Sequence, residues 1–240
     1  MKKRLGISGL AVHVPPYRVS LKDWCEWTES PWDKTNAVIG RSFRMRGPHQ
    51  SVYTMAATAV MRLIERYDID PQRVGFLGLG TESSTDNSAG AVIVKGMLNE
   101  GRKIQGLPPI GRHCEVPEVK HACLGGIYAV KHGLRYLALE DEDRCAIVVS
   151  ADIAEYARGS SGEPTQGAGA VAMLLERDPK LLSVDLKSIG SASDYRAVDF
   201  RKPVLRNIIR GTLNCEFQDL HVYNGKYSTK CYLDETLREL

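Results

Sequence analysis

Three short runs of mainly apolar residues constrain the fold of this 240-residue chain most strongly. They are Val74 to Leu79, Arg144 to Ala151 and Gly167 to Glu176. Continuous apolar runs of this length are typical of strands that are covered on both faces. Because such cover comes from helices on each side of a sheet, the runs predict an α/β protein.

Segments with a helical pattern alternate with these strands. From Val52 to Ile64, apolar residues recur with the 3.6-residue period of an amphipathic helix. Other predicted elements are strands at Leu5–Val14, Cys114–Val119 and Leu182–Ile189, helices at Ser88–Leu98, Cys123–Leu139 and Ser228–Leu240, and an exposed loop at Asn99–His113. The helix at Cys123–Leu139 carries little charge in its first turns, so we expect it to be buried. Few amphipathic helices remain to cover the sheet, which predicts that the chain is part of a larger assembly.

Composition and charge exclude several classes of protein. The chain is 43% hydrophobic and 25% charged, as in soluble globular proteins. A net charge of +3 without a separate Lys/Arg block argues against nucleic-acid binding. No apolar run approaches the length of a membrane span. The segment from Leu5 to Val14 lacks a small-residue cleavage site, which favours a strand over a signal peptide.

The cysteine pattern points to free thiols. The chain has six cysteines (Cys25, Cys114, Cys123, Cys145, Cys215 and Cys231) with no C-x-x-C pair and no metal-ligand spacing. We therefore expect reduced cysteines, a cytoplasmic location and no metal site.

One of these cysteines lies where a helix is predicted to begin. The run from Glu118 to Tyr128 places Cys123 in the first turn, directly before Leu124 and two glycines. Unpaired N–H groups and the positive end of the helix dipole favour a thiolate there. The same N–H groups can hold an oxygen that becomes negative when a thioester is attacked. A buried structural cysteine is an equal alternative on this evidence.

Several further segments, taken with the cysteine run, carry a family resemblance. They are Gly80–Ser88, Ala151–Ala157, Gly162–Met173, Asp199–Pro203, Val222–Ser228 and Cys231–Leu233. In this order they resemble 3-hydroxy-3-methylglutaryl-CoA synthases, members of the thiolase superfamily. The Gly-Glu-Pro-Thr-Gln-Gly-Ala-Gly run within them is highly specific. A single cysteine near glycines also fits ketoacyl synthases and thiolases.

The resemblance implies a thiolase-like layered fold, of which this chain is the first of two β/α halves, with a mixed sheet and a buried central helix. Residues 1–190 correspond to the half that bears the nucleophile, and residues 191–240 to a family-specific insertion or connecting segment. The second half is absent from this chain, so it is either truncated or supplied by another subunit. A homo- or hetero-oligomer is therefore expected.

The resemblance also implies roles for individual residues. Cys123 matches the nucleophile that takes up an acetyl group, and Glu82 matches the general acid/base. One carboxyl group in an apolar pocket can remove a proton from the acetyl methyl and return a proton to the product alkoxide. From the residues alone, a turn or helix-cap carboxylate beside Ser83 and Ser84 is the favoured interpretation of Glu82. Four more residues match segments near the active site, where a buried hydrogen-bonding role is an equal alternative: Asp152, Tyr156, Thr165 and Asp199.

One departure from the family is a missing histidine. The family carries a His-x-Pro motif beyond the segment that this chain matches. His13 precedes Val14 and Pro15 but ends the first predicted strand. His121 lies two positions before Cys123, a spacing at which helical side chains do not face each other. His221 precedes a predicted turn and is expected to be a loop residue, so none of the three replaces the motif.

The implied activity is a condensation of acetyl-Cys123 with an acetoacetyl thioester. The substrates are thioesters of coenzyme A or of an acyl carrier protein, with no other cofactor. Basic residues (Lys95, Arg102 and Lys103) either contact a phosphate of the carrier or form a solvated face. One alternative function is a ketoacyl-synthase or thiolase condensation, against which the Glu82 motif argues. Another is a half-site, non-catalytic subunit whose partner supplies the histidine.

Overall fold

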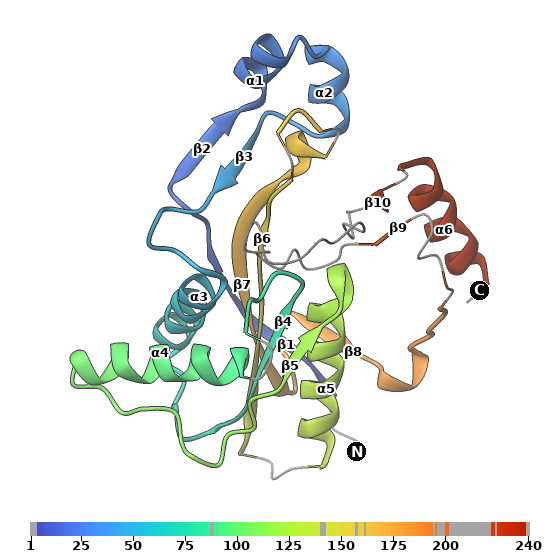
Figure 1. Ribbon diagram of the computed structural model, residues 1–240. Coiled ribbons are helices and arrows are strands. Elements are labelled where there is room, and N and C mark those ends of the chain that lie inside the picture. The colour runs from blue at the N-terminus through green and yellow to red at the C-terminus, as the bar shows by residue number, and fades with distance from the viewer. Residues whose placement is uncertain are drawn as a thin grey trace, which may run out of the picture. The chain divides into compact units, whose positions relative to one another are not determined.

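The computed structural model describes residues 4–86, 89–139, 143–156, 158–160, 162–193, 195, 200–201, 222–223 and 225–238 (Figure 1). The chain forms two compact units, Met1–Leu186 and Lys187–Leu240. In the second unit, strand β9 (Phe200–Arg201) pairs antiparallel with β10 (Val222–Tyr223), and helix α6 spans Gly225–Arg238. The predicted C-terminal helix is therefore present, although it begins three residues earlier than expected.

The first unit alternates strands and helices along the chain. In order, its elements are β1 (Leu5–His13), β2 (Tyr17–Ser20), α1 (Leu21–Thr28), α2 (Trp32–Val38), β3 (Ser42–Met45), α3 (Val52–Arg66), β4 (Val74–Thr81), α4 (Gly90–Ile104), β5 (Glu118–Lys120), η1 (Ala122–Leu124), α5 (Gly125–Leu139), β6 (Cys145–Ala154), η2 (Glu163–Thr165), β7 (Gly167–Arg177) and β8 (Leu182–Val184). A short 3-10 turn, η3 (Leu186–Ser188), follows β8.

A mixed sheet of six strands forms the centre of this unit, in the order β5-β4-β6-β7-β1-β8. Strand β4 pairs in parallel with β5 and β6, whereas the pairs β6–β7, β7–β1 and β1–β8 are antiparallel. All eight residues of β4 and the first five of β6 are buried, as the apolar runs predicted. The predicted α/β class and mixed sheet are confirmed.

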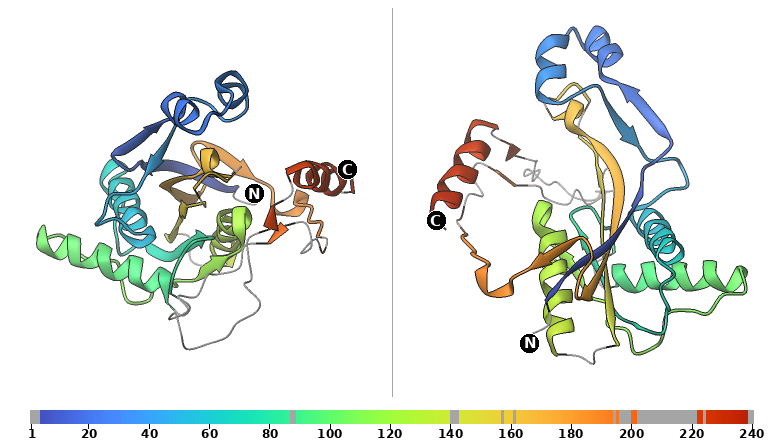
Figure 2. Two further views of the ribbon diagram at one scale, coloured as in Figure 1. Left: turned by 45° about the horizontal axis from the view of Figure 1, so that its top comes forward. Right: turned by 180° about the vertical axis from the view of Figure 1, so that it is seen from behind.

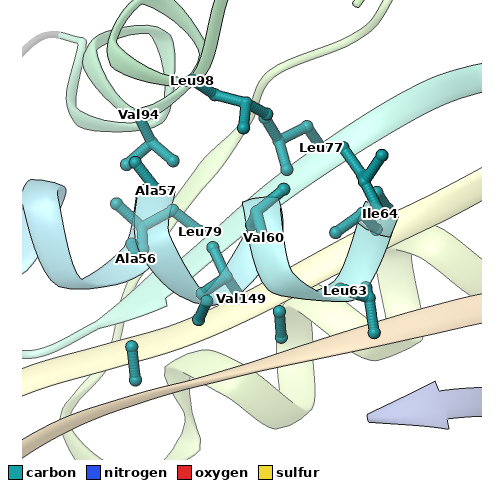
Figure 3. Close-up of a cluster of buried hydrophobic side chains, with 14 of the residues drawn as sticks. Ala56, Ala57, Val60, Leu63, Ile64, Leu77, Leu79, Val94, Leu98 and Val149 are labelled. Atoms are coloured by element: carbon teal, nitrogen blue, oxygen red, sulfur yellow. The ribbon is translucent and has the colours of Figure 1, made fainter. Parts of the chain in front are cut away.

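Successive residues of the central strands face two different helical layers (Figures 1 and 2). Leu77, Leu79 and Val149 pack in one hydrophobic cluster with residues of α3 and α4, which Figure 3 shows in detail. Phe76 and Val148 pack in a second cluster with residues of α5. Because side chains alternate between the two faces of a strand, this pattern places α3 and α4 on one face of the sheet and α5 on the other.

Helix α3 has a well-defined N-terminus. The hydroxyl of Ser51 accepts a hydrogen bond from the Thr54 N–H at 3.2 Å, and the Thr54 hydroxyl accepts one from the Ser51 N–H at 2.8 Å. This reciprocal capping pairs two of the N–H groups that a helix leaves unsatisfied at its start. The apolar face then packs on the sheet, as its 3.6-residue period predicted.

Helix α5 is buried on one face only within this chain. Gly125, Ala129 and Leu134 lie against the sheet, whereas Ile127 is 66% exposed and Leu139 is 88% exposed. The sequence predicted a buried helix because its first turns carry little charge. The structure shows which face the sheet covers and leaves apolar side chains on the opposite face.

The predicted exposed loop at residues 99–113 is wrong in its first part, because α4 continues to Ile104. Leu98 is fully packed, and Gly101 lies beside Met61 of α3, so packing against α3 overrides the low helix propensity of the glycines. The rest of the predicted loop, after Ile104, is hydrogen-bonded to side chains of α4. Arg102 donates to the carbonyl of Pro108 at 2.6 Å, and Lys95 donates to the carbonyl of Gly111 at 2.7 Å. These two cations therefore anchor the connection to β5, and neither forms the solvated face that the sequence suggested.

Two further predictions for strands need correction. The predicted strand at residues 114–119 is short, spanning Glu118–Lys120 after an isolated bridge between Phe76 and Glu115. The predicted strand at residues 182–189 ends at Val184 and turns into η3. Residues 17–45, for which the sequence indicated no elements, form a small lobe of β2 and β3 with α1 and α2. Its core consists of Leu21, Trp24, Cys25 and Phe43.

Candidate functional site at the carboxyl end of the sheet

Glu82 and Cys123 follow two neighbouring parallel strands. Thr81, the last residue of β4, pairs in register with Lys120, the last residue of β5. Glu82 comes directly after β4, and Cys123 lies in η1, three residues after β5. Parallel strands in register end on the same side of a sheet, so both residues lie at what we call the carboxyl end of the sheet.

Glycines allow the start of α5 to pack directly on β4. A Cβ atom on Gly80 would collide with the backbone of Gly125 and Gly126, and a Cβ atom on Gly125 would lie 2.7 Å from the carbonyl oxygen of Val119. Glycine in a strand often marks such a close approach of another backbone. The two glycines behind Cys123 are therefore required by helix-on-strand packing, which also fixes where the thiol lies.

Cys123 is exposed, in contrast to the other cysteines that are described in this unit. Cys25, Cys114 and Cys145 are buried. Burial raises the pKa of Cys114 to about 11 and the pKa of Cys145 to about 12, so both remain protonated near neutral pH. The alternative of a buried structural cysteine at position 123 does not apply in this structure.

The backbone before Cys123 has an unusual conformation. Ala122 has a φ of 34°, in the left-handed region that residues other than glycine seldom adopt. The Leu124 N–H donates to the carbonyl of His121 at 2.9 Å and closes a tight turn around the cysteine. Helix α5 begins two residues after Cys123, so this cysteine precedes a helix N-terminus, where unpaired N–H groups can stabilise negative charge.

The side chain of Asp152 fixes the backbone around Glu82. Its Oδ1 atom accepts hydrogen bonds from Thr81 Oγ1 (3.0 Å), Glu82 N–H (2.7 Å), Ser83 N–H (3.0 Å) and Ser83 Oγ (2.8 Å). The Ser83 hydroxyl in turn accepts from the Ile153 N–H at 2.8 Å. Hydrogen bonds to a carboxylate are among the strong ones in proteins. The structure therefore brings Asp152 and Glu82 together and ties the segment after β4 to β6.

A second set of contacts ties the same segment to β5. The hydroxyl of Ser84 donates to the carboxylate of Glu118, and Lys120 donates to the carbonyl of Ser84 at 2.5 Å. The sequence alone indicated no role for these three residues. They lie inside the motifs that carry the family resemblance, but only the pairing of β4 with β5 shows that they meet.

The specific run from residue 162 to 169 completes the connection between β6 and β7 and continues into β7, which begins at Gly167. Thr165 is exposed in η2, and its hydroxyl donates to the carbonyl of Gly162 at 2.7 Å. The ring of Tyr156 packs against Gly162, where a Cβ atom would lie 2.8 Å from the ring. Because β6 runs parallel to β4, this connection also lies at the carboxyl end of the sheet. Asp199 lies outside the described residues.

The structure places two of the three histidines that sequence analysis considered. His13 is the last residue of β1, is buried, and its Nε2 lies 2.9 Å from the side-chain nitrogen of Gln50. His121 precedes η1, so the helical-spacing argument against it does not apply; its ring packs on that of Tyr128, with centroids 5.1 Å apart. His221 lies outside the described residues.

The described part of the chain holds neither a metal-ligand cluster nor a membrane-spanning helix. No cluster of three or more His, Cys, Asp or Glu residues there has a geometry suited to a metal ion. Within the same residues, none of the helices combines the length and the apolar character that crossing a bilayer requires.

The fold and the placement of these residues define a class of protein. A mixed sheet lies between helical layers, and a thiol stands at the start of a helix beyond one of its parallel strands, as in thiolase-like α/β proteins. A family model described as hydroxymethylglutaryl-coenzyme A synthase N terminal matches residues 1–180. The chain belongs to the hydroxymethylglutaryl-CoA synthase family.

Individual relatives agree with this assignment. A hydroxymethylglutaryl-CoA synthase of Enterococcus faecalis is 32% identical over 200 residues, which is 83% of this chain and 49% of the relative. The structure of MvaS in complex with 3-hydroxy-3-methylglutaryl coenzyme A is 35% identical, with a TM-score of 0.81, and the match covers 98% of this chain and 51% of MvaS. The HMG synthase of the curacin biosynthetic pathway, in complex with holo donor-ACP, shares the fold at 20% identity, with a TM-score of 0.77 over 99% of this chain and 54% of that chain. The chain thus spans about half the length of the relatives it matches.

Proposed function

We propose that this chain is the nucleophile-bearing half of a condensing enzyme that makes a 3-hydroxy-3-methylglutaryl thioester product. The observation that carries the proposal is the position of Cys123. It is the exposed thiol at the start of α5, and it lies at the same end of the sheet as Glu82. Exposure lets a thioester reach the sulfur, and the helix terminus stabilises the negative charge that its attack creates.

The first step is the transfer of an acetyl group. The Cys123 thiolate attacks the carbonyl carbon of an acetyl thioester and forms a tetrahedral intermediate. The bond to the carrier sulfur then breaks, the carrier leaves as a thiolate that takes up a proton, and acetyl-Cys123 remains. The N–H groups around the start of α5 are the donors suited to the oxyanion.

The second step is the condensation. The Glu82 carboxylate removes a proton from the methyl group of acetyl-Cys123, and the resulting carbanion attacks the ketone carbon of an acetoacetyl thioester. Protonated Glu82 returns this proton to the tertiary alkoxide. One water molecule then hydrolyses the thioester at Cys123, which releases the product and restores the thiol.

The remaining residues act around these two. Asp152 holds the segment that carries Glu82 through the four hydrogen bonds to its Oδ1 atom, and its role is positional. Tyr156 and Thr165 belong to the connection between β6 and β7 and contact the substrates from that side. We retain Asp199 as a residue near the active site on the family resemblance alone.

We propose coenzyme A as the carrier, because MvaS, which binds 3-hydroxy-3-methylglutaryl coenzyme A, is 35% identical to this chain. Acyl carrier protein is the alternative carrier, since the curacin enzyme binds a donor-ACP, but its 20% identity supports only the fold. The free thiols of the described cysteines support a cytoplasmic location.

The length of the relatives supports a second half, in a longer chain or in a partner subunit within a homo- or hetero-oligomer. We assign residues 1–190 to the first thiolase-like half and residues 191–240 to the connecting segment. The second half would supply the His-x-Pro motif that the resemblance implies. This assignment also accounts for the exposed apolar face of α5.

Labelled acetyl-CoA tests the proposal. We expect one acetyl group per chain on Cys123, mapped by peptide mass spectrometry, and its loss in Cys123→Ala. The half-buried Cys231 provides the control, because Cys231→Ala should be acetylated as the wild type is. We expect Glu82→Gln to accept acetyl but to form no product with acetoacetyl-CoA. Acetylation of Cys123→Ala, or unchanged condensation by Glu82→Gln, contradicts the assigned roles.

The product separates the proposal from its alternatives. A branched hydroxy acid supports the proposed reaction, whereas a linear β-ketoacyl product indicates a ketoacyl-synthase or thiolase reaction. Acetylation without turnover until a partner with a His-x-Pro motif is added indicates a half-site subunit. Failure to accept acetyl even with that partner would leave only an assembly role.

A further inference from the structure

A tyrosine in the first turn of α3 holds the far end of the segment that carries Glu82. The hydroxyl oxygen of Tyr53 accepts hydrogen bonds from the N–H of Thr85 at 3.0 Å and from the N–H of Asp86 at 2.7 Å. Tyr53 is 8% exposed and belongs to the main hydrophobic core. Its oxygen is therefore held in place by a packed ring on a capped helix.

Side chains from three elements thus form hydrogen bonds with residues 81–86. Asp152 of β6 binds residues 81–83, and Glu118 and Lys120 of β5 bind Ser84. Tyr53 of α3 binds the next two residues. Asp86 then continues the chain of contacts, because its Oδ1 atom accepts from the Ala89 N–H at 2.8 Å, beside the start of α4.

The chemistry of a phenol suits this position. A tyrosine oxygen has two acceptor sites, and here two adjacent backbone N–H groups occupy them. Phenylalanine would fill the same space in the core and would leave both N–H groups without this acceptor. The residues after Glu82 would then be free to move relative to α3, while the contacts to β5 and β6 remain.

We propose that Tyr53 is a positioning residue for Glu82. The Tyr53 hydroxyl holds the backbone of Thr85 and Asp86 and thereby keeps the Glu82 carboxyl directed at acetyl-Cys123. This inference rests on the proposed acid/base role of Glu82. It assigns to the hydroxyl of Tyr53 an effect on the condensation step and none on the earlier acetylation of the thiol.

The same helix offers a matched control. Tyr67 lies at the other end of α3, its ring packs against Gly9, and its hydroxyl accepts from the N–H of Leu10 at 3.1 Å. Tyr67 is half-buried, and Tyr67→Phe removes one hydroxyl and its hydrogen bond to a backbone N–H, as Tyr53→Phe does, but at the opposite end of the helix from the Glu82 segment.

The experiment compares Tyr53→Phe, Tyr67→Phe and the wild type in two measurements. In amide hydrogen exchange, we expect Thr85 and Asp86 to exchange about tenfold faster in Tyr53→Phe only, which corresponds to the loss of an ordinary hydrogen bond. In kinetics with acetyl-CoA and acetoacetyl-CoA, we expect kcat for condensation to fall about tenfold in Tyr53→Phe. Its KM and the acetylation rate should stay within about twofold of the wild type.

Each outcome decides one of the two proposals. Unchanged exchange at residues 85 and 86 refutes the role of Tyr53, and so does an equal loss of acetylation and condensation, which is the result expected for general destabilisation. If the wild-type chain accepts no acetyl group, with or without its partner, the proposed function fails. The exchange comparison then still decides whether Tyr53 holds the segment.

Discussion

Replacing Gly80 by alanine is expected to disturb the packing that positions the candidate nucleophile. The added Cβ would collide with the backbone of Gly125 and Gly126 at the start of α5. Overpacking a well-packed site costs about 1–3 kcal/mol, and backbone atoms cannot rotate away, so we take the upper value. The Gly→Ala change also stabilises the folded state by about 0.5–1 kcal/mol, because alanine lowers the conformational entropy of the unfolded chain. The free energy of unfolding should therefore fall by about 2 kcal/mol.

Gly96 in the middle of α4 provides the matched control. A Cβ at this position meets no atom within 4 Å, so Gly96→Ala adds no clash. Alanine is the better helix former, and the free energy of unfolding should rise by about 0.5–1 kcal/mol. The two substitutions are chemically identical and are expected to have opposite effects.

Urea unfolding followed by circular dichroism measures both variants against the wild type. We expect a lower midpoint for Gly80→Ala and a higher one for Gly96→Ala, with similar slopes. A Gly80→Ala variant as stable as the wild type would show that α5 does not lie against β4 as described. A destabilised Gly96→Ala would show that Gly96 does not lie in a helix with open space around it.

Three further outcomes follow from the same structure. Burial and the positive charge of Arg62 lower the pKa of His13 below 6.5, so the unfolded chain binds the proton more tightly. The free energy of unfolding should therefore decrease as the pH falls below about 6.5, by up to about 1.4 kcal/mol per pH unit. This decrease should be absent in His13→Asn. It should remain in the control His132→Asn, which replaces an exposed histidine. Iodoacetamide at about pH 8 should alkylate Cys123 while Cys114 and Cys145 remain unmodified, as peptide mapping will show. Asp152→Asn should slow condensation of acetyl-CoA with acetoacetyl-CoA by about tenfold or more; an unchanged rate would contradict its positional role.

The sequence predicted the strands at the centre of the sheet because their side chains are apolar on both faces. The sequence also predicted α3 from the 3.6-residue period of its apolar residues. A local cap at Ser51 sets the N-terminus of this helix. Elements of this kind can be predicted from the sequence, because the residues that determine them lie within the element itself. The same reasoning gave no elements for residues 17–45, where Leu21 and Phe43 pack on each other across a small lobe.

The extent of α4 shows why local reasoning failed elsewhere. Its glycines are weak helix formers, and the sequence therefore ended the helix near residue 98. The structure continues it to Ile104 because Leu98 and Gly101 pack on α3. Contacts between segments distant in sequence decide this helix end, and they cannot be read from propensity.

By itself, the sequence determined the α/β class, the family and the residue types available for chemistry, because these depend on local pattern and motif. The tertiary structure decided which of them meet. Glu82 and Cys123 are 41 positions apart, as their residue numbers show (123 − 82), and are placed at one end of the sheet only by the register of β4 and β5. Asp152 and Tyr53 come to the Glu82 segment from a different strand and from a helix. The physical reason is that strand pairing and core packing, which act between distant parts of the chain, set the direction in which each polar group points.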